Sequence, residues 1–173
     1  MTRRSLPLFF ALCMAGCVGW LWSRGSTAAG PASSPGAIPE APAERRKAAL
    51  FYSDLGPDTV DVSTYPQAQR RNYTVYVRVC SFCHTLARSV NAPFVSRGWW
   101  DFYITNMRMR ARRLDIPMTD HDVRDTLDFL EYDSNERKVG RAKDFDATRA
   151  ELKRRFELVL DERVDALRRQ PLP

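Results

Sequence analysis

Cysteine and histidine are scarce in this sequence, which has four Cys and two His in 173 residues. Within the part expected to fold, no stretch alternates convincingly between apolar and polar side chains, so we expect almost no β structure. No internal repeat is evident, which argues against a repeat architecture. The sequence also lacks a pair of carboxylates, a nucleophile with its base and a phosphate-binding loop, so we do not expect it to be an enzyme acting alone.

The excess of positive charge is small. The sequence holds 27 Lys and Arg against 21 Asp and Glu, a formal net charge of +6, and two of these cations, Arg3 and Arg4, lie in an expected targeting segment that holds no acid. A surplus spread along the chain and balanced by acids does not indicate binding to nucleic acid. Over the full sequence, 44% of the residues are hydrophobic and 28% are charged. This is the composition of a globular domain, and it excludes polytopic membrane proteins, fibrous repeats and fully disordered chains.

The first 23 residues have the layout of an export signal. Arg3 and Arg4 precede an apolar run from Leu6 to Trp22, as in a positively charged region followed by a hydrophobic one. Two kinds of anchor stay open. The run Met14-Ala15-Gly16-Cys17 resembles a lipobox in which Cys17 is lipidated, as in a lipoprotein, or the whole run is an uncleaved transmembrane anchor. Either predicts a protein tethered to the membrane on the periplasmic side of a bacterial cell.

We expect an all-α protein in four parts. Residues 1–23 form the signal or anchor, residues 24–46, rich in Ala, Pro and Ser, a flexible tether, residues 47–135 a helical domain and residues 136–173 an amphipathic carboxyl-terminal region. The periodicity of apolar residues predicts helices over 67–82, 98–113, from Thr119 onward and over 147–169. Thr119 and Asp122 have the spacing of a capping box.

The most informative motif is Cys80-Ser81-Phe82-Cys83-His84, a C-x-x-C-H sequence at the end of a predicted helix. Two thiols three positions apart can each add to a vinyl group of haem, and His84 can then bind the iron as proximal ligand. A thioredoxin-like redox pair would require a βαβ context, and a zinc site would require more ligands than His121 and the amino-terminal cysteines offer. The motif therefore predicts one covalently bound haem c.

Residues 65–135 resemble the small monohaem c-type cytochromes. A helix ending in C-x-x-C-H, a middle helix and a capped last helix ending in Phe129-Leu130-Glu131-Tyr132 carry this resemblance. A narrower pattern is similar to reaction-centre cytochromes of green sulfur bacteria and to cytochrome domains of quinohaemoproteins: Cys83-His84-Thr85-Leu86, Trp100, Met107 and Met118-Thr119-Asp120. The resemblance implies the cytochrome c fold and one-electron transfer.

Four residues are candidates for the distal iron ligand. Met107 lies on the apolar stripe of the middle helix and matches the Trp-to-Met spacing of the resembled domains. Met118 follows a proline and is the alternative, although it can also act as a hydrophobic staple before the cap at Thr119. We expect Met109 and His121 to face solvent. A thioether ligand would raise the reduction potential of the haem.

Several further side chains are expected near the haem. Arg97 or a tryptophan indole could bind a propionate, and a basic stripe on the middle helix is either a solvated face or a docking patch for an acidic partner or anionic lipid. Aromatic residues near the motif would keep the haem dry: Tyr76, Phe82, Phe94, Trp99 and Trp100. The basic stripe consists of Arg108, Arg110, Arg112 and Arg113.

Three functions are compatible with these observations. The first is a membrane-tethered monohaem cytochrome that relays single electrons between membrane or periplasmic redox proteins. The second is the electron-accepting haem subunit of a larger membrane or dehydrogenase complex, and the third is a haem-based sensor with an open distal position. The apolar stripe of the last helix needs a covering surface. We favour a partner subunit slightly over folding back onto residues 47–65 of the same chain.

Overall fold

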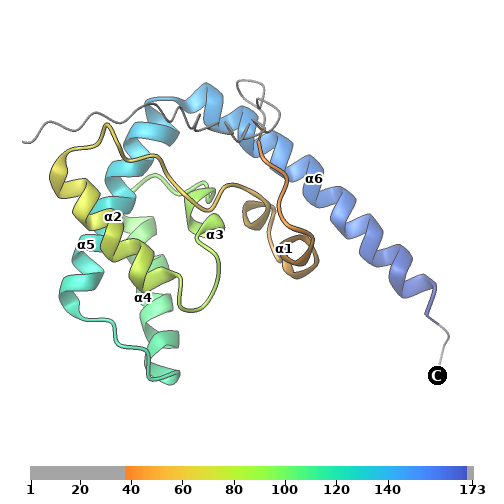
Figure 1. The fold of residues 1–173 in the computed structure, drawn as a ribbon, viewed down its shortest axis with the longest axis horizontal. Coiled ribbons are helices and arrows are strands. Elements are labelled where there is room, and N and C mark those ends of the chain that lie inside the picture. Colours follow the sequence, from red (N-terminus) through yellow and green to blue (C-terminus); the bar gives the residue numbers. More distant parts are fainter. Residues whose placement is uncertain (1–37, 171–173) are drawn as a thin grey trace, which may run out of the picture. The chain divides into compact units, whose positions relative to one another are not determined.

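The computed structural model describes residues 38–170, and within this range the regular secondary structure is all helical, as predicted, with no strand (Figure 1). Its elements, in chain order, are α1 (Ala43–Ala48), the 3₁₀ turn η1 (Tyr52–Leu55), α2 (Gln67–Cys80), α3 (Ala87–Val90), α4 (Arg97–Arg113), α5 (Asp120–Asp133), the π-helical segment η2 (Ser134–Val139) and α6 (Ala142–Arg168).

The main core lies between α2, α4 and α5, the three longest helices before α6. Tyr76 of α2, Trp100 of α4 and Phe129 of α5 are fully buried in one hydrophobic cluster. The rings of Tyr76 and Phe129 lie 5.0 Å apart, which places α2 directly against α5. The indole Nε1 of Trp100 donates to the hydroxyl of Ser134 at 3.0 Å, so the polar edge of this buried ring is satisfied. These helices form the frame on which the motif is held.

Local capping sets the starts of α4 and α5. The backbone N–H of Trp99 donates to the hydroxyl of Ser96, the N-cap of α4. At α5 the predicted capping box is present, because Thr119 and Asp122 bond each other's backbone N–H groups. Pro66 is the N-cap of α2 rather than its first residue. Helix α2 ends at Cys80 instead of residue 82, because the chain turns within the C-x-x-C sequence.

Helix α6 packs on the segment that precedes α2. Leu152 and Val159 of α6 are buried in a second hydrophobic cluster with Ala41, Ala49 and Leu55. Much of the expected stripe is thus covered by the same chain, against our preference for a partner subunit. The final part of the expected tether, from residue 38 to residue 46, also belongs to this packed unit, because the cluster includes Ala41 and α1 begins at Ala43.

Membrane attachment concerns residues outside the described range. Between residues 38 and 170 no helix combines the length and the apolar character needed to cross a bilayer. The expected signal or anchor, the lipidation site Cys17 and residues 24–37 of the expected tether lie outside the described residues. Their roles therefore stay predictions.

The junction between α5 and α6 contains a feature that the sequence did not suggest. Residues Ser134–Val139 form a π-helical segment in which Gly140 N–H donates to the carbonyl of Asn135. Such segments occur at strained or functional points of helices. Here it turns Arg137 and Lys138 inward: Arg137 pairs with the buried Asp133, and the ammonium of Lys138 donates to the carbonyl of Ala92 at 2.8 Å.

Candidate functional site

The C-x-x-C-H motif joins the end of α2 to the start of α3. Cys80 is the last residue of α2 and is partly buried, whereas Cys83 lies in the following turn and is exposed. His84 is partly buried, and its Nδ1 lies 2.8 Å from the carbonyl oxygen of Thr85. When Nδ1–H donates to that carbonyl, Nε2 is left as the lone-pair nitrogen available to a metal.

These residues line a cavity of about 360 Å³ between α2, α4 and α5. That volume is in the range typical of sites that enclose a small ligand or cofactor, ~300–1,000 Å³. The three motif residues Cys80, Cys83 and His84 all line it. The rest of the wall is mostly apolar and comes from several parts of the chain: Leu50, Val79, Ile104, Met107, Ala111, Leu114, Ile116, Met118, Val123 and Leu130, with the polar residues Arg88, Ser89, Tyr103, Arg110 and Thr126.

Both candidate methionines line this cavity. Met107 enters from the middle of α4, and Met118 from the loop that follows α4. Met109 is 49% exposed and His121 has a side chain that is 71% exposed and paired with Asp125, as expected for both. Of the four residues considered as distal ligands, Met107 and Met118 line this cavity, and Met109 and His121 do not.

The path of the loop that carries Met118 is determined by the turn at the end of α4. Asp115 adopts a left-handed conformation, with φ of 53°, and the N–H of Ile116 donates to the carbonyl of Ala111 at 2.9 Å. This is the hydrogen-bond pattern of a Schellman motif, with Asp115 in the position usually taken by glycine. The turn reverses the chain so that Ile116 and Met118 face the cavity that α4 also lines.

The protonation of Cys80 helps to distinguish the chemistries that a C-x-x-C pair can support. Burial, with a smaller contribution from the neighbouring Cys83, raises the pKa of Cys80 to about 12. A dithiol redox pair depends on a thiol whose pKa is lowered, because the thiolate is the nucleophile. Cys80 is therefore a neutral thiol at physiological pH and is not itself a ready nucleophile.

Two hydroxyl groups on the cavity wall have no hydrogen-bond partner among the described atoms. They are the phenol of Tyr103 and the hydroxyl of Thr126, and both oxygens are shielded from solvent. Buried polar groups are nearly always hydrogen-bonded in folded proteins. Both hydroxyls on the wall of this cavity are therefore available to bond a polar group that enters it.

The side chains expected to bind a propionate do not line the cavity. Arg97 pairs with Asp128 and Glu131 on the surface, and the Trp100 indole is bonded to Ser134, so neither reaches the cavity. Arg88 and Arg110 line it instead. Nor do the five expected aromatics line it; Tyr103 is its aromatic residue.

Some of these residues could have been found from the sequence and others could not. Tyr103 lies four positions before Met107, so both fall on one helical face. Arg88 follows His84 by four positions, but α3 is too short to show a periodic pattern. Leu50 and Thr126 are distant from the motif in sequence and carry no local signal for a site.

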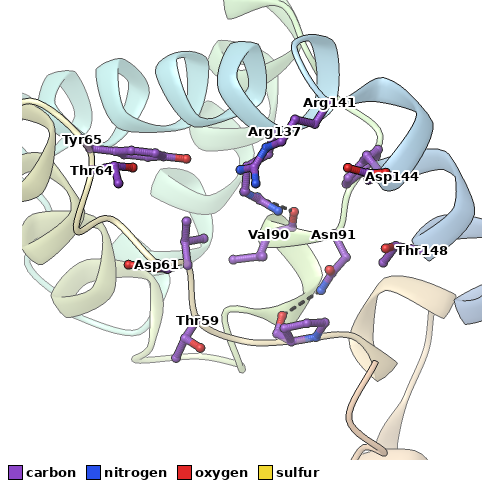
Figure 2. A pocket seen from close by; sticks show the side chains of 13 residues that line it. Thr59, Asp61, Thr64, Tyr65, Val90, Asn91, Arg137, Arg141, Asp144 and Thr148 are labelled. Carbon is purple, nitrogen blue, oxygen red and sulfur yellow. Dashed lines mark hydrogen bonds between the residues drawn. The ribbon is translucent and has the colours of Figure 1, made fainter. Parts of the chain in front are cut away.

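A larger cavity, of about 460 Å³, lies elsewhere (Figure 2). None of the motif residues or methionines lines it. Figure 2 shows Arg137 donating to the carbonyl of Val90. The side-chain amide of Asn91 donates to the carbonyl of Pro57. Arg137 is already paired with Asp133, so this cavity is polar but its most buried cation is neutralised.

Across residues 38–170, no group of three or more His, Cys, Asp and Glu side chains is placed to hold a metal ion. The described part of the chain therefore adds no observation in favour of the zinc alternative. Comparison with protein-family models, with curated proteins and with solved structures finds no match for the chain.

Proposed function

We propose that this chain is a membrane-tethered monohaem cytochrome c that relays single electrons between membrane or periplasmic redox proteins. The observation that carries the proposal is the convergence of Cys80, Cys83 and His84 with two methionines on one largely apolar cavity. The residues fit a haem in kind: two thiols for attachment, an imidazole and a thioether for the iron, and unpaired hydroxyls for polar groups.

Each residue has a distinct role in this proposal. The Cys80 and Cys83 thiols would each add across one vinyl group, so that an S–C bond forms and the thiol proton moves to the adjacent carbon without a change of oxidation state. His84, oriented through Nδ1 by the Thr85 carbonyl, would bind the iron through Nε2. Met107, or Met118, would supply a thioether ligand to the iron. Bound haem would take up and release one electron at its iron.

The proposed location rests on the amino-terminal sequence. Covalent haem attachment takes place on the exported side of the membrane, and the segment 1–23 has the layout of an export signal. We infer a periplasmic domain held to the membrane by this segment or by a lipid on Cys17. No nucleic-acid partner is proposed.

Haem staining of denaturing gels tests the proposal. The full chain, produced in a bacterial host with a working cytochrome c maturation system, should give a stained band. The double variant Cys80→Ser/Cys83→Ser should give none, because both thioether bonds are removed, while Cys17→Ser serves as a matched cysteine control that keeps the stain. A colourless wild-type protein from such a host would exclude the proposal.

A second candidate is the haem subunit of a larger complex, and it draws support from the far half of α6. Leu158, Leu160, Val164 and Leu167 are exposed large apolar side chains on this helix. A subunit interface would bury such residues. Purification in mild detergent distinguishes the two: a subunit stays with a stoichiometric partner, and Val164→Ser/Leu167→Ser should release it, whereas a mobile carrier purifies alone.

A further inference from the structure

One wall of the haem cavity belongs to a segment that α6 holds in place. We call residues 49–55 the cap segment; it runs from the end of α1 through η1. Within it, Leu50 lines the cavity although 65% of its surface is exposed. A residue that is both exposed and cavity-lining lies at the mouth, where it separates the interior from solvent.

Asp54 organises the cap segment from within. Its carboxylate is buried and accepts hydrogen bonds from the backbone N–H groups of Leu50, at 2.8 Å, and Phe51, at 3.1 Å. It also forms a bidentate pair with Arg88, at 2.8 and 2.9 Å. Burial tends to raise the pKa of Asp54, but the bonds from Arg88, Leu50 and Phe51 outweigh it and leave the pKa below its ordinary value. One carboxylate thus fixes both Leu50 and Arg88, two residues of the cavity wall.

A second set of bonds joins the cap segment to the helix that follows the motif. The side-chain amide of Asn91 donates to the carbonyls of Ser53 and Pro57, on either side of Gly56, and to that of Ala87 in α3. Because α3 begins three residues after His84, the cap segment is tied closely to the motif.

The side chain of Arg163 in α6 is hydrogen-bonded to backbone carbonyls at the end of α1 and at the first residue of the cap segment. The guanidinium of Arg163 donates to the carbonyls of Arg46, Lys47 and Ala49, at 3.0, 2.9 and 2.7 Å. Ala49 is the residue before Leu50, so the bond to its carbonyl acts one peptide away from the cavity mouth. On the same helix, Val159 packs into the cluster that contains Ala49 and Leu55.

We propose that α6, through Arg163 and the cap segment, controls the access of water to the haem cavity and thereby tunes the reduction potential of the haem. The inference rests on the proposed cytochrome function. A haem more open to water should have a lower potential, because water stabilises the more positively charged oxidised iron. Arg163 and Asp54 are positioning residues in this account, and Leu50 forms the barrier.

The test is redox titration of the full, haem-loaded chain and three variants. Leu50→Ser removes the apolar barrier at an exposed position, so it should fold normally and lower the potential. Arg163→Gln should also lower it, and both should be oxidised several-fold faster by ferricyanide, because the mouth is more open. Arg163→Lys should lower the potential less than Arg163→Gln does, because the lysine keeps a donor to the carbonyls.

Arg154→Gln is the matched control on the same helix, because the hydrogen bonds of Arg154 go to Glu151. It should leave the potential at the wild-type value. Wild-type potentials in both Leu50→Ser and Arg163→Gln, with haem bound, would overturn the inference and leave the cytochrome function intact. If Arg163→Gln does not fold, Arg163→Lys and Leu50→Ser decide together, and wild-type potentials in both would overturn the inference. A chain without haem would overturn the proposed function itself and the inference with it.

Discussion

The two cavity methionines are held in different ways, and this difference bears on which one binds iron. Met107 is part of α4, where its backbone is fixed by helical hydrogen bonds and by the burial of Ile104 and Ala111 on the same face. Met118 lies in a loop, directly before the N-cap Thr119, and Val123, four residues after that cap, lines the same cavity. Met118 and Val123 thus hold the sequence positions of a hydrophobic staple, a structural role that Met107 cannot take, and Met107 stays our prediction for the distal ligand.

We expect Met107→Ala to abolish the weak sulfur-to-iron absorption band of the oxidised protein and to lower the reduction potential, because a thioether ligand raises it. Met118→Ala should keep the band and lose part of the folding free energy, about 1–2 kcal/mol at a partly buried site. Visible spectroscopy of both variants decides the assignment. Loss of the band in Met118→Ala with retention in Met107→Ala would transfer the role to Met118.

Lys138 is a buried cation without a carboxylate bonded to it. Its ammonium donates to the carbonyls of Ala92 and Phe94 and lies 4.7 Å from the centre of the Trp100 ring. Burial lowers the pKa of Lys138 to about 7, the nearby Asp133 opposes this, and Arg137 adds to it. In the unfolded chain this lysine has its ordinary pKa, so between pH 7 and 10 the unfolded state binds more protons than the folded one.

The free energy of unfolding should therefore rise with pH above 7, since stability increases wherever the unfolded state holds more protons. Between pH 7 and 9 this one group contributes a rise of about 2 kcal/mol. Lys138→Met, which keeps the length of the side chain, should flatten the rise. Urea unfolding at pH 7, 8 and 9 measures both proteins, and equal slopes would show that Lys138 is not the source.

At the scale of the elements, the cap segment depends on close contact between a glycine and a side-chain amide. A Cβ atom at Gly56 would lie 2.4 Å from Nδ2 of Asn91, a distance that no packed structure tolerates. Asn91 cannot move away without losing its bonds to the carbonyls of Ser53 and Pro57. The need for glycine here is steric, because its backbone is not in the left-handed region.

Gly56→Ala should destabilise the protein by about 2–3 kcal/mol, through overpacking and the loss of buried hydrogen bonds. Gly98→Ala is a suitable control, since no atom lies within 4 Å of a Cβ placed there. In α4 that change should stabilise by ~0.5–1 kcal/mol, because alanine has the higher helix propensity. Chemical unfolding compares the two, and equal effects would contradict the contact with Asn91.

The helices that could be predicted from sequence are those whose ends are set locally. Ser96 and Thr119 lie next to the helices they cap, and the C-x-x-C-H motif and the apolar face of α4 are also local patterns. The cap segment and its short turn η1 could not be predicted, because they depend on Asp54 bonding to Arg88, 34 residues away. The cavity wall combines both kinds of residue, so sequence identified its reactive groups but not Leu50, Arg88 or Thr126.

For the molecule as a whole, α6 has two apolar surfaces, one buried against the same chain and one exposed. Leu152 is fully buried against the segment from Ala41 to Leu55, whereas Leu167 is 66% exposed. The first surface belongs to the fold of the described unit. The second is free to contact another protein, so a docking role remains a prediction for the far half of the helix alone.

Leu152→Ala should lower the free energy of unfolding by about 2–5 kcal/mol, as deletion of a fully buried leucine side chain does. Leu167→Ala should stay within ~0.5 kcal/mol of the wild type, because the side chain is exposed. Thermal or urea unfolding of both variants measures this. A stability loss at Leu167 equal to that at Leu152 would mean that the far half of α6 is also covered in solution.

The mass of the intact, denatured chain tests the central claim most directly. Wild-type protein from a maturation-competent host should exceed the double variant Cys80→Ser/Cys83→Ser by the mass of one haem, after correction for the two substitutions, because thioether bonds survive denaturation. His84→Ala should lower the yield of haem-bearing chain without removing the attachment sites. A wild-type mass equal to that of the bare polypeptide would contradict the assignment of this protein as a cytochrome c.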